Sequence, residues 1–182
     1  MIRQLLTAAG QKDLPGGYVS DDHHGVEAAA SNDPTRSPET YVGYARAQNF
    51  VGSRVVHDDT QDYHAPGTLA ADQWSLDGHW NVHGENAQLE QASGAIVYRF
   101  RGRDLHLVLG PASDGKPIRF RVTIDGKAPG ADHGMDTDAD GNGTVSAQRL
   151  YQLVRQANGS GEWLFQITFL DPGVQAYAFT FG

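Results

Sequence analysis

The sequence predicts an all-β fold, an antiparallel β-sandwich of the jelly-roll type. Several segments alternate apolar and polar residues with a period of two, and the clearest is 118–124, with Ile118, Phe120, Val122 and Ile124 on one face. Turn signals rich in Gly, Asp and Pro separate these segments, and no long helical patterns alternate with them. Short strands joined by tight turns are typical of antiparallel sandwiches and jelly rolls.

Two segments need separate interpretation. In 74–82 we expect a turn at Asp77–Gly78 between two alternating stretches. The segment 149–156 fits either a helix or a strand, and its neighbours favour a strand. The other predicted strands place on one face Ile96, Tyr98 and Phe100; Leu105, Leu107 and Leu109; Trp163, Phe165, Ile167 and Phe169; and Tyr177, Phe179 and Phe181.

The N-terminal part of the sequence has a different composition. Residues 1–10 have apolar positions at helical spacing and end in glycine, which predicts a short helix that resembles the end of an upstream element. Residues 11–38 are rich in Gly, Pro, Asp and Ser and predict a linker or an irregular arm. The sandwich domain is therefore expected to span residues 39–182.

Composition excludes several classes of function. The formal net charge of −8 argues against nucleic acid as a partner, because phosphate binding requires a basic surface. The sequence contains no cysteine, so thiol chemistry, disulfides and thiolate metal sites are excluded. No apolar run approaches the roughly 18 residues of a membrane span. Neither a Ser–His–Asp arrangement nor a nucleotide-binding motif is present, and we expect no enzymatic activity.

The segment "DADGNGTVSAQR" (138–149) resembles a calcium-binding loop, since oxygen-bearing side chains recur at alternate positions. Arg149 stands at the twelfth position, where a glutamate is normally required, so the segment is not an EF-hand. The alternative is a hairpin loop in which Asp and Asn side chains bond to their own backbone. The candidate calcium ligands are Asp136, Asp138, Asp140, Asn142 and Thr144.

Two histidines form a weaker candidate metal site. His79 and His83 are four residues apart, which places both on one face of a strand, where imidazoles can bind zinc. A third ligand would have to come from His57, Asp58 or His64 through the fold. The alternative is that both histidines are exposed or hydrogen-bonded.

Aromatic residues suggest a carbohydrate ligand. Aromatic rings can stack on the C–H faces of a sugar while nearby polar side chains bond its hydroxyls. The candidate stacking residues are Trp80, Tyr63 and Tyr151. Trp163 and Trp74 share the phase of core positions, so most of the tryptophans are expected to be structural.

Several long segments resemble a known family. They include "SPETYVGYARAQNF", "QWSLDGHWNV", "RDLHLVLGPASDGKPIRFRVTIDGKAPGADHG", "DTDADGNGTV", "RLYQLVRQ" and "FLDPGVQAYAFTFG". Together they resemble the C-terminal domain of DipZ-type thioredoxin-like proteins, over about residues 37–182. The resemblance implies a carbohydrate-binding-module-like sandwich outside the cytoplasmic membrane, covalently linked to a thioredoxin-like domain whose last helix would be residues 1–10. The redox cysteines of that family belong to the thioredoxin-like domain, so no redox residue carries over to this sequence.

The sequence leaves two functional hypotheses open. The first is a non-catalytic accessory domain of a thiol–disulfide protein, binding carbohydrate or an envelope component and thereby positioning the redox domain. It would lie in the periplasm or another extracytoplasmic space, tethered to the membrane through its parent chain. The second is a scaffold or homodimerisation domain without a glycan ligand, with or without a structural calcium ion. A metal-dependent enzyme using the aspartates or histidines is a third and weaker reading.

Overall fold

The computed structural model describes residues 34–157 and 161–182. The expected helix at 1–10 and most of the arm at 11–38 lie outside the described residues. The regular secondary structure of the described residues is almost entirely β, which confirms the predicted class. Its elements are β1 (Thr40–Tyr41), β2 (Thr60–Tyr63), β3 (Trp74–Val82), β4 (Ala87–Leu89), β5 (Ala95–Gly102), β6 (Asp104–Gly110), β7 (Ile118–Ile124), η1 (Gly130–Asp132), β8 (Asn142–Val145), β9 (Arg149–Arg155), β10 (Gly161–Phe169) and β11 (Gln175–Phe181).

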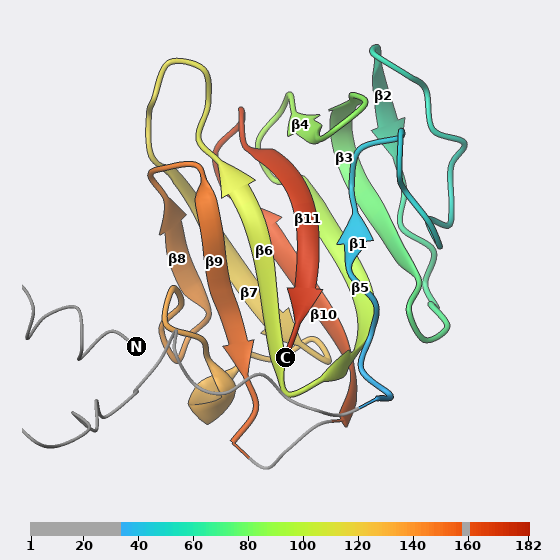
Figure 1. Ribbon diagram of the computed structural model, residues 1–182. Coiled ribbons are helices and arrows are strands. Elements are labelled where there is room, and N and C mark those ends of the chain that lie inside the picture. The colour runs from blue at the N-terminus through green and yellow to red at the C-terminus, as the bar shows by residue number, and fades with distance from the viewer. Residues whose placement is uncertain (1–33, 158–160) are drawn as a thin grey trace, which may run out of the picture.

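The strands form one curled sheet, which Figure 1 shows with β6, β9 and β11 on one limb and β5, β7 and β10 on the other. The hydrogen-bonded order is β8–β7–β10–β5–β3–β4–β11–β6–β9, with β1 paired to β11 and β2 paired to β3. Among the described residues, every pair of named strands is antiparallel. The expected antiparallel architecture is therefore confirmed, in the form of a continuous curled sheet.

Strand β3 connects the two limbs. Its first half, Trp74–Asp77, pairs with β5, and its second half pairs with β2 and β4. The bend lies at Gly78, which has a φ of 98°, a conformation that side chains other than glycine rarely adopt. The turn expected at Asp77–Gly78 is therefore wrong: the glycine bends one continuous strand and does not end it.

The segment that fitted either a helix or a strand is a strand. Residues Arg149–Arg155 form β9, which pairs with β6 along its length. The buried positions of β6 and β9 lie opposite each other, as in Leu107 and Tyr151. Packing against β6 therefore decides the conformation of a segment whose own pattern is ambiguous.

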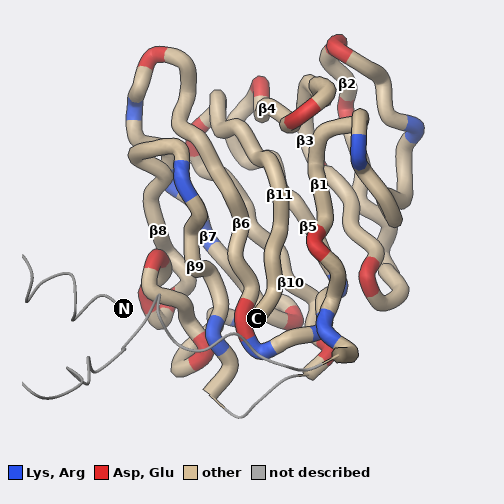
Figure 2. Tube along the Cα trace, in the orientation of Figure 1, with Lys and Arg blue, Asp and Glu red and all other residues tan. Residues whose placement is uncertain are grey.

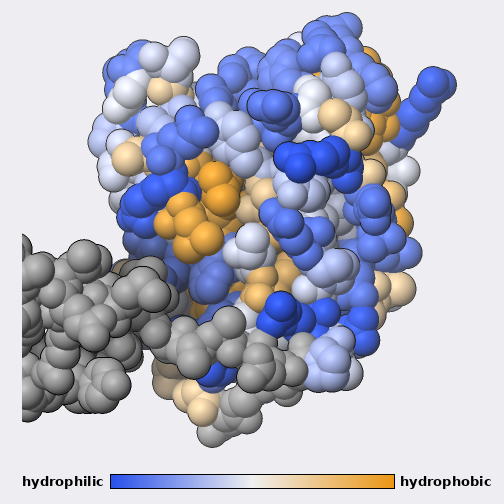
Figure 3. Space-filling view, viewed as in Figure 1, coloured by the Kyte–Doolittle hydropathy of each residue, from blue (hydrophilic) through white to orange (hydrophobic). Residues whose placement is uncertain are grey.

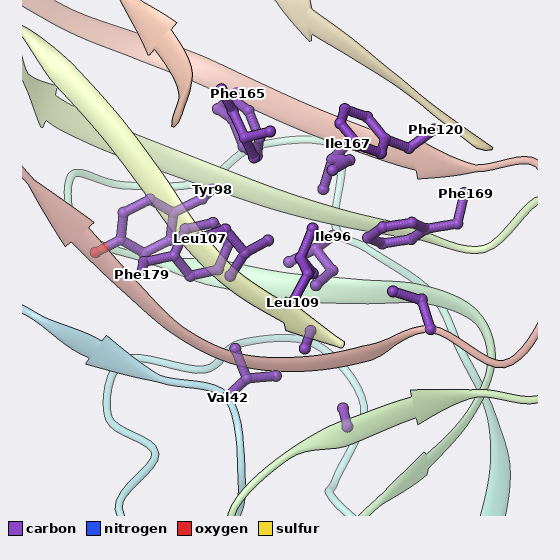
Figure 4. Close-up of a cluster of buried hydrophobic side chains, with 14 of the residues drawn as sticks. Val42, Ile96, Tyr98, Leu107, Leu109, Phe120, Phe165, Ile167, Phe169 and Phe179 are labelled. Atoms are coloured by element: carbon purple, nitrogen blue, oxygen red, sulfur yellow. The ribbon is translucent and has the colours of Figure 1, made fainter. Parts of the chain in front are cut away.

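The core lies between the two limbs of the sheet. The ring of Tyr98 on β5 stacks on Phe179 of β11 at 5.2 Å between centroids, and Phe165 of β10 meets Phe179 edge-on at 6.1 Å. Figure 4 shows these side chains directed toward one another, together with Leu107 and Ile167. The inward faces predicted for β5 and β6 are buried, as is that of β7 apart from the half-buried Ile124. On β11 the predicted Phe179 and Phe181 are buried, but the prediction for Tyr177 is wrong, because a bulge between Ala176 and Ala178 buries Ala176 instead.

Candidate functional site

The three aromatic residues expected to stack on sugar are buried. Trp80, Tyr63 and Tyr151 each have 0% of their surface exposed. Trp80 lies in phase with the core positions of β3, and its Nε1 donates to the Asp77 carbonyl at 2.8 Å. Since a buried ring offers no face to a ligand, the stacking assignment of these residues is wrong.

The hydroxyl groups of the two tyrosines have structural partners. The Tyr151 hydroxyl donates to the carbonyl of Ala147 at 2.8 Å and accepts from the backbone amide of Ser146 at 3.0 Å. The Tyr63 hydroxyl accepts a hydrogen bond from the Val56 amide at 3.2 Å. These bonds attach loops to the core, which explains why tyrosine occupies these interior positions.

The acidic loop is held together by its own hydrogen bonds. Asp138 Oδ1 accepts from the backbone amides of Asp140 at 3.0 Å and Asn142 at 2.8 Å, and its Oδ2 accepts from the Asn142 side chain at 3.1 Å. The backbone amide of Asn142, and then its side chain, lower the pKa of Asp138. Gly141 has a φ of 84° and lies against the Val122 carbonyl. This geometry is that of the tight turn considered as the alternative to a calcium loop.

Asp136 points away from the loop, toward β9. Its carboxylate accepts from Arg149 at 2.6 and 3.1 Å and from the backbone amide of Gln152 at 2.8 Å. Arg149, the residue that breaks the calcium-loop pattern, is therefore the partner of one predicted ligand. Over residues 34–157 and 161–182, no group of three or more His, Cys, Asp or Glu side chains is placed to hold a metal ion.

Three of the predicted calcium ligands instead line a shallow pocket of about 410 Å³. These ligands are Asp138, Asn142 and Thr144. The lining also includes Leu170, which is 41% exposed, and Arg119, the register partner of Thr144, which is paired with Asp171 at 2.8 Å. The loop thus contributes to a small polar hollow, while Asp136 and Asp140 are not among the residues that line it.

The two histidines each bond to a different aspartate. His79 Nδ1 lies 2.8 Å from Asp62 Oδ1, and the two residues are directly opposite in the β2–β3 register. His83 Nδ1 lies 3.0 Å from Asp58 Oδ1. Within the described residues the two histidines belong to no group of three or more ligands that could hold a metal ion, so the zinc site that the spacing suggested is not formed.

Both histidines belong to a larger polar surface on the outside of β3. Trp80 and Val82 point into the core, so His79, Asn81 and His83 face outward. Asn86 lies beside His83, whose backbone amide donates to the Asn86 carbonyl at 2.7 Å. We call this surface the β3 polar face; it comprises Asp58, Asp62, His79, Asn81, His83 and Asn86.

Two amide oxygens on the β3 polar face lack a partner. Asn81 Oδ1 and Asn86 Oδ1 are shielded from solvent and accept no hydrogen bond from any group in the described part of the chain. Buried polar atoms in folded proteins are nearly always hydrogen-bonded. Both side chains are half-buried as a whole, so their amides would have to rotate to bring these oxygens to the surface.

An aromatic pair borders the β3 polar face. The rings of Tyr44 and His57 stack with centroids 3.9 Å apart and planes inclined by 7°. The Tyr44 hydroxyl donates to Asp58 Oδ2 at 2.7 Å. The pKa of Asp58 is lowered first by the hydrogen bond from Tyr44 and then by the one from His83. The hydrogen bond to Asp58 in turn raises the pKa of Tyr44. The pair is anchored to the polar face through one shared carboxylate.

Acidic residues surround this part of the molecule. Figure 2 shows Asp and Glu positions near β2 and β4, as well as at the lower ends of β8 and β9. The acidic residues near β2 and β4 are Asp58, Asp59, Asp62, Glu85 and Glu90, and they outnumber the nearby Arg46 and Arg54. The local charge balance therefore has the same sign as that of the whole chain.

Comparison with known proteins places the chain in a family. The model of a family described as "Thioredoxin like C-terminal domain" matches residues 37–182. The chain belongs to this family. Among curated proteins it is similar to Protein DipZ of Mycobacterium bovis and to Protein DipZ of Mycobacterium tuberculosis, each 24% identical over 129 residues. The aligned part covers 68% of this chain and 18% of each relative.

The matched region has two properties that bear on the family's role. It contains no cysteine, so this thioredoxin-like C-terminal domain carries no thiol of its own. In the part that the structure describes, no helix is long and apolar enough to cross a membrane. The chain spans less than a fifth of the length of the two DipZ proteins.

Proposed function

We propose that this chain is the non-catalytic accessory domain of a thioredoxin-like thiol–disulfide protein. The observation that carries the proposal is the family match over 37–182 in a sequence without cysteine. Thiol chemistry in such a protein belongs to a covalently linked thioredoxin-like domain. The two DipZ relatives, of which the aligned part covers 18%, are long enough to include one.

The role proposed for the accessory domain is to bind carbohydrate or an envelope component, which places the redox domain near its clients. Support comes from the antiparallel all-β architecture, which is compatible with a jelly-roll sandwich like those of carbohydrate-binding modules. Because fold similarity alone is a weak argument for function, the surface chemistry must supply the ligand. The site of action would be periplasmic or otherwise extracytoplasmic, with the domain tethered through its parent chain.

The test is affinity gel electrophoresis against a panel of polysaccharides, run in parallel with calcium and with EDTA. The proposal predicts that at least one polysaccharide retards the chain and that an unrelated protein of similar charge is not retarded. Retardation in both buffers would show that binding is independent of calcium. Failure of every polysaccharide to retard the chain would contradict the carbohydrate role.

A second candidate function is a scaffold or self-association domain, with or without a structural calcium ion. The observation that favours it is an exposed apolar patch, which Figure 3 shows over β6 and β9. Leu150 is 39% exposed and lies opposite the half-buried Val108 in the β6–β9 register. Exposed apolar side chains that neighbour each other on a sheet are a common feature of protein interfaces.

The scaffold function is tested by light scattering during size-exclusion chromatography. If the patch mediates self-association, the wild-type chain is a dimer and Leu150→Glu is a monomer. Leu170→Glu is the matched control, because Leu170 is 41% exposed and lies outside the patch. A monomeric wild-type chain over a wide concentration range would contradict self-association.

A further inference from the structure

We propose that the β3 polar face is the binding site for a neutral saccharide, an inference that rests on the carbohydrate-binding role proposed above. Because the aromatic residues first expected to stack on sugar are buried, the inference assigns the ligand to the partly exposed polar side chains of β3 and its neighbours. The following steps take the hydrogen-bonding groups, the aromatic border and the charge in turn.

The two Asp–His pairs are similar in geometry and partly exposed, with 27% of the His79 side chain and 36% of the His83 side chain accessible. A carboxylate only accepts hydrogen bonds, so in each neutral imidazole the proton resides on Nδ1. The Nε2 atoms of His79 and His83 are then acceptors, and no group in residues 34–157 or 161–182 bonds to them. Asp62 and Asp58 fix both ring orientations in advance, which reduces the entropy lost when a ligand binds.

The amide side chains add groups that donate as well as accept. Asn81 lies between His79 and His83 on the same face of β3. Because Asn81 Oδ1 has no donor, rotation of this amide toward a ligand hydroxyl breaks no hydrogen bond at the oxygen. The same holds for Asn86 Oδ1. Sugar hydroxyls both donate and accept, so they match a surface that combines imidazole acceptors with amides.

The border of the face offers an apolar plane. His57 is exposed and lies parallel to Tyr44, so its outer side faces solvent. The stacked rings stand next to Asp58, which joins Tyr44 to His83. A sugar ring that bonds to the His83 and Asn81 side chains can place its C–H surface over this plane, as saccharides do on aromatic residues.

Charge selects among saccharides. The five carboxylates around β2 and β4 oppose a ligand that carries its own carboxylates or sulfates. A neutral glycan incurs no such repulsion. The site is therefore expected to bind neutral oligosaccharides and to reject uronic-acid polymers of the same length.

The experiment is calorimetric titration of the full chain with neutral glucan and mannan hexasaccharides and with a galacturonic acid hexasaccharide. Wild type is compared with Asn81→Ala and His83→Ala. His133→Ala is the matched control, since the His133 side chain makes one hydrogen bond within the described residues, to the Gly134 carbonyl, and its backbone bridges to Val154 of β9 and not to β3. We expect one neutral hexasaccharide to bind the wild type and each of the two polar-face variants to bind it about 3- to 10-fold more weakly. The His133→Ala control should bind it as the wild type does, and the galacturonic acid hexasaccharide should not bind.

The outcomes separate this inference from the role on which it rests. Asn81→Ala removes an amide whose oxygen has no partner, so its melting temperature should match that of wild type and a loss of binding reports on the ligand. Binding to wild type that is unchanged in both variants overturns the site while the carbohydrate role stands. Absence of binding to any hexasaccharide overturns both, and tighter binding of the acidic one overturns the proposed selectivity.

Discussion

Ser37 and Arg101 bond to each other in both directions. The Ser37 amide donates to the Arg101 carbonyl at 2.8 Å, and the Arg101 amide donates to Ser37 Oγ at 2.9 Å. Ser37 Oγ also donates to Asp72 Oδ1 at 2.5 Å, and the Arg101 side chain pairs with the same carboxylate. The chain is therefore fixed to β5 at the residue where the family match begins.

This contact predicts that Ser37→Ala lowers the free energy of unfolding by about 1–3 kcal/mol, because it leaves part-buried polar groups without a partner. Urea unfolding measures the change. Ser113→Ala is the control, since Ser113 is exposed. Equal stability of the two variants would show that the chain is not anchored at Ser37.

The bend in β3 predicts a large difference between two glycine substitutions. Gly78→Ala requires a side chain at a φ of 98°, with its Cβ 2.8 Å from the Gly94 Cα. We expect a loss of at least about 1–3 kcal/mol in the free energy of unfolding. Gly67→Ala should change stability little, because nothing lies within 4 Å of the added Cβ. If both variants unfold alike, β3 does not bend at Gly78.

The ion pair between Arg119 and Asp171 predicts a titration anomaly. Hydrogen bonds from the Arg119 side chain, and then from its backbone amide, lower the pKa of Asp171 from 3.8 to about 2. Because the pKa of Asp171 is lower in the folded than in the unfolded chain, this carboxylate stabilises the fold at pH values above the unfolded pKa of 3.8. That contribution is lost as the pH falls from 3.8 toward 2. Carbonyl NMR shifts recorded against pH should show the low pKa in the wild type.

Arg119→Gln should return the pKa of Asp171 toward its ordinary value, with a remaining depression from the backbone amide. It should also flatten the pH dependence of stability in the same interval. Arg121→Gln removes a charge two residues away on the same face of β7 and should leave the titration unchanged. An unperturbed Asp171 in wild type would contradict the bidentate geometry.

The acidic loop predicts that calcium leaves the melting temperature unchanged. Asp138 is satisfied within the turn, and Asp136 is engaged by Arg149 and Gln152. Thermal unfolding with calcium and with EDTA measures the effect, since an ion that binds only the folded state raises the midpoint. A rise of several degrees that disappears in Asp140→Asn would instead establish a structural calcium ion.

The sequence allowed the strands to be predicted because burial on one face imposes a period of two. The same phase also buries Trp80, which lies in register with Leu76 and Val82. The bend at Gly78 could not be predicted, since a local Asp–Gly pair signals a turn and only pairing with β5, β2 and β4 makes the strand continuous. Pairing with distant strands therefore overrides the local turn signal of the Asp77–Gly78 pair.

Only part of the β3 polar face could be predicted from the sequence. The four-residue spacing of His79 and His83 indicated a common face, and alternation would have added Asn81. Asp58 was among the candidates named for a third ligand, but Asp62 was not, because it reaches His79 only through the β2–β3 pairing, 17 residues away. Asp58 reaches His83 beside the bridge between His57 and Val82, 25 residues away. The two carboxylates orient the imidazoles, and because the described residues contain no group of three metal ligands, these histidines are interpreted as oriented hydrogen-bonding groups.

The most direct test of the account is an amide and imidazole NMR map of the isotope-labelled chain titrated with the neutral hexasaccharide that binds it. The account predicts that the perturbed signals cluster at His57, His79, Asn81, His83 and Asn86. Perturbations concentrated in residues 138–144 would move the ligand to the acidic-loop pocket, and a map without saturable shifts would contradict saccharide binding by this domain.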